Sequence, residues 1–333
     1  MALILGIDTS CDDTGIGIVR DSEVLANVVA SQTALHAQYG GVMPEQASRE
    51  HLSVIDAILQ KALDAADASL NDIDAVAATF GPGLVGALLV GLTYGKSLAW
   101  SLGKPFIPVH HLEGHIASSL AGSKLEPPFL CLIASGGHTS LFDVRAWGDY
   151  KELGKTRDDA AGEAFDKVAR LLGLGYPGGP ALSHAAETGD DSAFKFTVPL
   201  QGQKGFDFSF SGLKTAAAVL LQKEPDAPVN DVAASFEKTV VASLTEVSAR
   251  AAKHTGYKDI VVAGGVAANK RLKQEFATLG LTVHFPPLSL ATDNGAMIAL
   301  AAQQSLGQKM NNWDTDAKPY FPLDAELRES AFS

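Results

Sequence analysis

The second half of the chain repeats the order of segments found in the first half, and this repeat constrains the fold more than any other sequence feature. Residues 5–17 read as a strand, a polar turn and a second strand, and residues 130–142 show the same pattern. Residues 260–269 likewise resemble residues 76–85, and apolar runs that alternate with helical periodicity are typical of α/β layers. The sequence therefore predicts two similar βββαβα units that face one another across a cleft.

The boundaries of the units follow from the same pattern. An N-terminal lobe is expected over residues 1–126 and a C-terminal lobe over residues 127–333, with a mainly helical insertion at about residues 157–256. In the first lobe, the apolar pattern predicts four strands and two long helices: Leu3–Asp8, Thr14–Arg20, Glu23–Ala30 and Ile73–Phe80, then Pro44–Ala66 and Leu84–Leu102.

Composition limits the classes of protein that fit. A chain of 333 residues with 46% hydrophobic and 19% charged residues can bury two domain cores. It starts directly with a strand pattern, and no apolar run reaches about 18 residues without a glycine or a polar residue, so we expect a cytoplasmic protein with no membrane segment. Cys11 and Cys131 form neither a disulfide framework nor a C-x-x-C metal spacing.

The net charge of −12 argues against a protein dedicated to nucleic-acid binding, because phosphates are neutralised by clustered Lys and Arg. It does not exclude a local basic patch. Two loose basic stretches occur, at residues 151–170 and 270–273, and each alone reads more simply as a solvated helix face.

A pair of histidines, His111 and His115, follows an apolar strand-like run. On a helix these positions share one face, so both imidazoles can bind one metal ion, and Asp293 could supply an oxygen ligand. A zinc protease would need its general-base Glu directly after the first His. Here Glu113 lies two positions later, about 200° round a helix of roughly 3.6 residues per turn, so it points away from the metal face.

Glycine-rich turns end several of the predicted strands. Small residues followed by a helix N-terminus are natural phosphate cradles, because backbone N–H groups and the helix dipole point at the anion. Neither the G-x-G-x-x-G nor the G-x-x-x-x-G-K-[ST] phosphate motif is present, so the spacing assigns no common nucleotide-binding class.

Eight motifs in one order make the sequence similar to a known family. They are Ile4–Thr14, Gly81–Leu88, His111–His115, Ser135–Thr139, Ala161–Lys167, Tyr176–Pro180, Phe208–Lys214 and Thr292–Met297. Together they resemble the bacterial TsaD family of tRNA N6-adenosine threonylcarbamoyltransferases, which have a duplicated actin-like, Hsp70-like ATPase fold. The resemblance covers nearly the whole chain.

The resemblance implies transfer of a threonylcarbamoyl group from threonylcarbamoyl-adenylate to N6 of adenosine 37, in tRNAs that read codons beginning with A, with release of AMP. It also implies one divalent metal ion, Fe²⁺ first and Zn²⁺ second, bound by His111, His115 and Asp293. A nucleotide site is implied at Ile133, Ala134, Ser135, Gly136, Gly137, Asp166, Gly179 and Asn269. ATP with Mg²⁺ is expected to be bound or used by the complex.

The chemistry needs a group that handles the attacking amine. Asp12 follows the first strand and faces the predicted cleft, so we assign it as the carboxylate that orients the amine or accepts its proton. The alternative is a residue that only shapes its turn. Asp8 and Asp13 stand where Glu is frequent in the family and are left outside the catalytic core. Ser183 stands where relatives often carry an acidic residue, which makes a nucleotide contact from that position doubtful.

The resemblance also implies partners, and other functions remain as alternatives. By resemblance, tRNA is the substrate, and the partners are TsaB, a smaller paralogue that forms a heterodimer, and the ATPase TsaE. An actin-like small-molecule kinase is the main alternative, but such kinases hold Mg²⁺ through carboxylates and phosphates rather than an imidazole pair. A metalloprotease and a non-catalytic, ATP-dependent partner module are weaker alternatives.

Overall fold

A computed structural model describes residues 2–39, 41–306 and 312–325. The chain forms two compact units. The first comprises residues 1–125, 146–150 and 286–333, and the second comprises residues 126–145 and 151–285. In the described part of the chain, no helix is both long enough and apolar enough to cross a bilayer.

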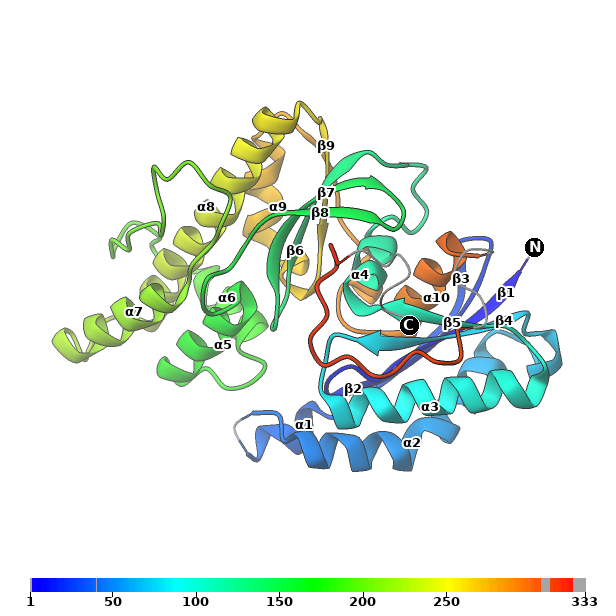
Figure 1. Ribbon diagram of the computed structural model, residues 1–333. Helices are drawn as coiled ribbons and strands as arrows, with labels where there is room; N and C mark the ends of the chain where they lie inside the picture. The colour runs from blue at the N-terminus through cyan, green and yellow to red at the C-terminus, as the bar shows by residue number, and fades with distance from the viewer. Residues whose placement is uncertain (1, 40, 307–311, 326–333) are drawn as a thin grey trace. The chain divides into compact units, whose positions relative to one another are not determined.

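The first unit contains a five-stranded sheet in the order β3-β2-β1-β4-β5 (Figure 1). Its strands are β1 (Leu3–Asp8), β2 (Asp13–Arg20), β3 (Glu23–Ser31), β4 (Ala75–Gly81) and β5 (Phe106–His110). The first three strands form an antiparallel meander, whereas β4 runs parallel to both β1 and β5. The parallel strands therefore end at the same edge of the sheet.

Helices cover both faces of this sheet (Figure 1). They are α1 (Thr33–Ala37), α2 (Pro44–Ala65), α3 (Val85–Leu102), α4 (His111–Ser119) and α10 (Gly295–Gln304), with short 3₁₀ turns at Leu70–Asp72 and Leu288–Leu290. Alternate residues of β1 enter two cores: Leu5 and Ile7 pack with α2 and α3, and Ile4 packs with α10. A strand buried on both faces explains the unbroken apolar run that predicts it.

The second unit repeats the same strand order, as β8-β7-β6-β9-β10. Its strands are β6 (Phe129–Ala134), β7 (Thr139–Ala146), β8 (Asp149–Lys155), β9 (Asp259–Ala263) and β10 (Thr282–His284). Strand β6 is antiparallel to β7 and parallel to β9, which is the arrangement of β1 with β2 and β4 in the first unit. The predicted duplication is confirmed.

The helices of the second unit are α5 (Ala161–Leu171), α6 (Gly178–Ala186), α7 (Ser211–Lys223), α8 (Val229–Thr255) and α9 (Lys270–Ala277), with a 3₁₀ turn at Gly265–Ala268. Four of them lie within the range expected to be mainly helical, between residues 157 and 256. Phe165, Phe208, Phe210 and Phe236 anchor the core that these helices form with the sheet.

The sequence pattern predicts one lobe over all residues from 127 to the end. In the structure, the described residues from Pro286 onward, α10 among them, are grouped with the first unit. The physical reason is the packing of α10 on β1 and β2, where backbone approaches backbone at Gly6, Gly17 and Gly295. Local periodicity carries no information about which sheet a C-terminal helix covers.

Candidate functional site

Helix α4 begins directly after β5, and this junction positions the histidine pair. His110 forms the N-cap: its Nδ1 accepts a hydrogen bond from the Leu112 amide at 3.1 Å, and its Nε2 donates to the Phe321 carbonyl at 2.9 Å. His111 and His115 then lie one turn apart on the same helix face, both buried. Their ring centroids are 4.7 Å apart and their planes make an angle of 80°.

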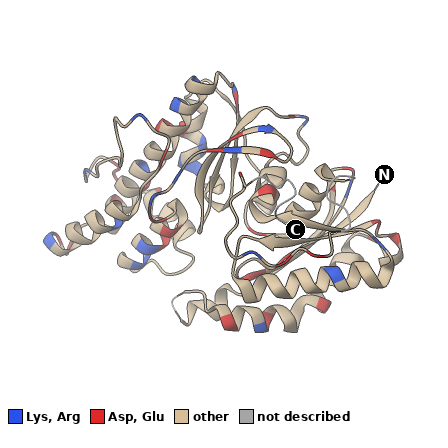
Figure 2. Cartoon of the chain, viewed as in Figure 1, with Lys and Arg blue, Asp and Glu red and all other residues tan. Residues whose placement is uncertain are grey.

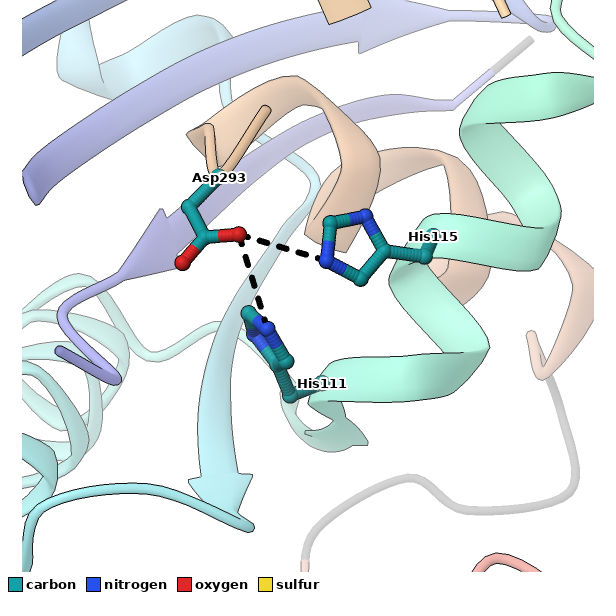
Figure 3. Close-up of side chains that lie close together, drawn as sticks. All are labelled: His111, His115 and Asp293. Carbon is teal, nitrogen blue, oxygen red and sulfur yellow. Dashed lines mark ion pairs between the residues drawn. The ribbon is translucent and has the colours of Figure 1, made fainter. Parts of the chain in front are cut away.

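Asp293 reaches the histidines from the turn before α10. Asn294 fixes this turn, because its Oδ1 accepts from the Met297 amide at 2.9 Å and its Nδ2 donates to the Thr292 carbonyl at 2.7 Å. Figure 3 shows one oxygen of Asp293 facing both rings: Oδ1 lies 3.6 Å from Nε2 of His111 and 3.2 Å from Nε2 of His115.

The three side chains fit a metal ion. Two ligands of one ion lie at most about 4.2 Å apart, twice a metal–ligand bond of about 2.1 Å, and both distances to Asp293 fall below that limit. Within the described residues, Nδ1 of buried His115 has no hydrogen-bond partner, and Nε2 has none beyond the ion-pair contact with Asp293 at 3.2 Å. A cation bound by Nε2 and Asp293 would satisfy Nε2. Two imidazoles and a carboxylate suit iron and zinc better than Mg²⁺.

Asp8 supports this cluster. Its Oδ1 lies 3.4 Å from Nδ1 of His111 and accepts a hydrogen bond from Thr79 at 2.6 Å, while its Oδ2 accepts from Ser10 at 3.1 Å. A carboxylate on the second ring nitrogen fixes the tautomer that leaves Nε2 free to bind a metal. Burial favours the neutral ring, but the charges of Asp293 and Asp8 outweigh it and raise the pKa of His111 to about 9.

Asp8 is not expected in the site from the sequence, but in the structure it lies beside His111. The sequence does contain information that points to this contact. Asp8 ends β1, and His111 follows the end of β5, so the two residues leave the sheet at the same edge. Only the strand order, with β4 between them, shows that they come close enough to touch.

Glu113 has no access to the metal-binding face. It is buried, and its Oε1 accepts a hydrogen bond from the Tyr150 hydroxyl at 2.8 Å. This agrees with the position expected from helical spacing. A carboxylate held in this way cannot activate water at His111 and His115, which removes the structural basis for a metalloprotease.

Asp12 lies in the turn between β1 and β2, four residues beyond Asp8. Its carbonyl accepts a hydrogen bond from the Gln32 amide at 3.1 Å, and its side chain is half-buried. Burial, aided by the charges of Asp12 and Asp293, raises the pKa of the neighbouring Cys11 thiol, so Cys11 is not a thiolate nucleophile. Burial also raises the pKa of Asp13 to about 6.

The candidate nucleotide residues all belong to the second unit. Ile133 and Ala134 are buried at the end of β6, and the loop Ser135–Gly137 follows them, with both glycines exposed. Ser135 organises this loop: its Oγ accepts from the His138 amide at 3.1 Å, and its carbonyl accepts from the Gly162 amide at 3.1 Å. A Cβ on Gly162 would lie 2.6 Å from that carbonyl, so the loop and α5 are packed backbone to backbone.

Asp166 and Asn269 both act as helix caps. Oδ1 of Asp166 accepts from the amides of Gly178 and Gly179 at 2.8 and 3.1 Å, at the start of α6, and burial raises the pKa of this carboxyl group. Asn269 begins α9, where its Oδ1 accepts from the Leu272 amide at 2.8 Å.

The amide of Asn269 also links α9 to two other helices. Its Nδ2 donates to Ser183 Oγ at 2.9 Å and to Glu237 Oε1 at 2.6 Å. Ser183 and Gly179 both lie on α6, so this helix joins Asp166 and Asn269 into one group. The sequence contains no signal for the Ser183 contact, because 86 residues separate the partners.

Neither basic stretch seen in the sequence forms a free cationic surface. Figure 2 shows Lys and Arg interspersed with Asp and Glu on the second unit. Arg157 pairs with Asp207 at 2.9 Å, Lys270 pairs with Glu187 at 2.5 Å, and Lys167 contacts two carboxylates. The interpretation of these stretches as solvated faces is therefore the better one, but residues 151–155 lie on strand β8 and not on the expected helix face.

Solved structures with similar folds define the class of protein. Component A of (R)-2-hydroxyglutaryl-CoA dehydratase from Acidaminococcus fermentans aligns with 92% of this chain and 100% of its own, with a TM-score of 0.56 and 18% identity. HypF from T. kodakarensis aligns with 91% of this chain and 47% of its own, with a TM-score of 0.60 and 16% identity. With the duplicated sheets, these likenesses place the chain among proteins with an actin-like ATPase fold.

Sequence comparison identifies the family within that class. The family model for TsaD, tRNA N6-adenosine threonylcarbamoyltransferase, matches residues 23–300. An enzyme of that name from Thermus thermophilus is 55% identical over 323 residues, which cover 96% of this chain and 99% of the relative. The enzyme from Microcystis aeruginosa is 55% identical over 314 residues and 91% of each chain. The chain belongs to the TsaD family of acyltransferases, and neither a kinase nor a protease is favoured.

Proposed function

We propose that this chain transfers a threonylcarbamoyl group from threonylcarbamoyl-adenylate to N6 of adenosine 37, in tRNAs that read codons beginning with A, and releases AMP. The observation that carries the proposal is the 55% identity, over 96% of the chain, to an enzyme named for this reaction. The cluster of buried His111 and His115 with half-buried Asp293 supports it, because acyl transfer to a weak nucleophile needs a strongly polarised carbonyl.

The reaction makes two demands on the protein. An exocyclic adenine amine is a poor nucleophile, so the carbonyl must be activated, and negative charge on the departing AMP phosphate must be stabilised. A divalent metal, iron first and zinc second, held by His111, His115 and Asp293 would supply Lewis-acid chemistry at this position. Asp8 would keep the ring of His111 in the tautomer that binds through Nε2.

Asp12 is the proposed carboxylate for the amine. As the bond from N6 to the carbonyl carbon forms, the bond from that carbon to the adenylate phosphate oxygen breaks, and N6 must lose a proton. Asp12 is half-buried in the turn that follows Asp8, within the same unit as the metal cluster, and its carboxylate would accept this proton.

The second unit is proposed to bind the nucleotide part of the adenylate, and ATP with Mg²⁺ if the complex uses it. The exposed loop Ser135–Gly137, after Ile133 and Ala134, would offer backbone donors to a phosphate. Gly179 lies at the N-terminus of α6, where the α5 residue Asp166 already accepts from the first amides, and Asn269 caps α9. The side chains of Asp166 and Asn269 would hydrogen-bond the ribose or the base edges.

The proposed protein partners are a TsaB paralogue, as a heterodimer, and the ATPase TsaE. Helices α2 and α3 carry exposed apolar side chains that suit a protein interface: Leu52 on α2, and Val85 and Leu89 on α3. Because tRNA is the proposed substrate and both cysteines are free, we place the activity in the cytoplasm.

The test combines activity with metal content. The purified chain, its two partners, threonylcarbamoyl-adenylate and an unmodified tRNA would be incubated together and the nucleosides identified by mass spectrometry. We expect threonylcarbamoyladenosine with the natural chain and none with the double substitution His111→Ala and His115→Ala. His184→Ala is the matched control, since that side chain is 88% exposed on the second unit. No product from folded, metal-loaded chain would refute the transferase and favour a kinase or a scaffold.

A further inference from the structure

A chain of buried polar side chains runs through the first unit and ends at the turn between β1 and β2. Its members are Thr14, Gln32, His36 and His51, all between 0% and 4% exposed. They come from β2, from α1 and its N-cap residue Gln32, and from α2. None of these four side chains belongs to the metal cluster or to the proposed nucleotide site. Buried polar groups of this kind specify one arrangement of the backbone when all their hydrogen bonds are made.

The hydrogen bonds of His51 require one tautomer. Its Nε2 lies 3.0 Å from the Cys11 carbonyl, which can only accept, so Nε2 carries the proton. Its Nδ1 must then accept, and it has two donors: Thr14 Oγ1 at 2.7 Å and Gln32 Nε2 at 3.3 Å. Burial lowers the pKa of His51, which agrees with a neutral ring that donates on one side and accepts on the other.

Gln32 is the second residue that holds the turn. Its Oε1 accepts from His36 Nε2 at 3.0 Å, because His36 Nδ1 already accepts from the Met43 amide at 3.3 Å. The backbone amide of Gln32 donates to the Asp12 carbonyl at 3.1 Å. Gln32 and His51 are joined to each other, and together they hold the carbonyls of two successive residues, Cys11 and Asp12.

The turn is held along its whole length. The Ser10 carbonyl accepts from the Leu84 amide at 2.8 Å, so three carbonyls in a row are bound by three different parts of the unit. At one end of this turn Asp8 contacts His111. At the other end is Asp12, which has no helix or strand of its own to fix it. The bonds to the turn therefore set where the Asp12 carboxylate lies relative to the metal ligands.

We propose that His51 is a positioning residue for the transfer reaction: as the Nε2–H tautomer, joined to Gln32, it holds the Cys11 carbonyl and thereby aims the Asp12 carboxylate at the attacking amine. This role rests on the proposed function, in which Asp12 handles that amine. In this role His51 would touch neither substrate nor metal, since its ring nitrogens contact Thr14, Gln32 and the Cys11 carbonyl. Its contribution is geometric, and a displacement of about 1 Å at a reacting group can lower a rate by about a hundredfold.

Two substitutions separate the two ring nitrogens. His51→Gln places an amide N–H near Nε2 and keeps the donor to Cys11, whereas His51→Asn places an oxygen near Nδ1 and keeps only the acceptor for Thr14 and Gln32. In the reconstituted complex we expect His51→Asn to lower kcat about tenfold to a hundredfold. We expect KM for tRNA and metal content to stay as in the natural protein. His51→Gln should restore most of kcat.

The outcomes of this experiment distinguish failure of the proposed function from failure of the positioning role of His51. If the natural protein makes no product, the proposed function fails. If it makes product and His51→Asn has the natural kcat, or if both variants lose kcat equally, the positioning role is wrong. ¹⁵N spectra of the natural protein give a test that needs no variant: His51 should be an Nε2–H imidazole at neutral pH, and an Nδ1–H tautomer would overturn the assignment.

Discussion

Helix α10 lies directly against β1 and β2, and glycines at the crossing set the position of Asp293. A Cβ added at Gly17 would lie 2.1 Å from the amide nitrogen of Ala296 and 2.3 Å from its Cα. Ordinary contacts between such atoms are about 3.5 Å or longer. Because both obstructing atoms are backbone, Gly17→Ala would have to move α10 away from β2 by about 1 Å or more.

Movement of α10 should change the position of Asp293 relative to the two histidines. Asp293 lies two residues before the start of α10, and its Oδ1 is 3.2 Å from His115. Metal sites keep their bond lengths within about 0.2 Å, so a shift of about 1 Å removes an effective ligand. We expect the metal affinity to fall at least about tenfold, which is about 1.4 kcal/mol. Overpacking of this kind should also lower the free energy of unfolding by about 1–3 kcal/mol.

The measurement is competitive metal titration, with thermal unfolding of the metal-free protein alongside. Gly212→Ala is the matched control, since no atom outside the neighbouring backbone of α7 lies within 4 Å of a Cβ added at that position. The control should bind metal normally and unfold at the natural temperature or slightly above it, because alanine is the better helix former. Natural metal affinity in Gly17→Ala would refute the argument that the glycine crossing positions Asp293.

Three further predictions concern single carboxylates. Burial raises the pKa of Asp13 from 3.8 to about 6, so its ionised form destabilises the fold above pH 6. Asp13→Asn should therefore increase the free energy of unfolding of the metal-free protein at pH 7.5 by at most about 3 kcal/mol. The increase should shrink as the pH falls toward 4. An increase that does not change with pH in urea titrations would contradict this prediction. Asp8→Asn should weaken metal binding about 10- to 100-fold through His111, and unchanged affinity would show that the carboxylate is not needed. Asp158 accepts from the amides of Phe210 and Ser211 at 2.7 and 3.1 Å, and these bonds, with those from two serine hydroxyls, outweigh burial and lower its pKa. Asp158→Ala should lower the free energy of unfolding by about 1 kcal/mol at pH 7. This loss should disappear as the pH falls below 3.8 through the lowered pKa of Asp158. An equal loss at pH 7 and pH 2.5 would count against the charge-assisted cap.

Much of the fold can be predicted from the sequence, because its elements are local. The strand over Leu3–Asp8 is found as predicted, and the helix predicted at Pro44–Ala66 ends one residue earlier, at Ala65. Apolar spacing specifies both, since a buried strand and an amphipathic helix each have a fixed period. The repeat of the strand order needs no more than a comparison of the two halves.

Part of the candidate site is local as well. His111 and His115 share a face because they are four residues apart on one helix, and Glu113 points away for the same reason. The candidate role of Asp293 could be suggested from its residue type. Its position could not, because nothing within ten residues of Asp293 specifies which strands α10 will cover.

What only the tertiary structure decided is which distant residues meet. Helix α10 joins the first unit because Gly17 and Gly295 allow it to approach β2 backbone to backbone. The strand order then brings Asp8 to His111, and burial gives the turn before Asp12 a fixed shape. These contacts depend on close packing between segments far apart in the chain, and packing has no period that a single sequence can display.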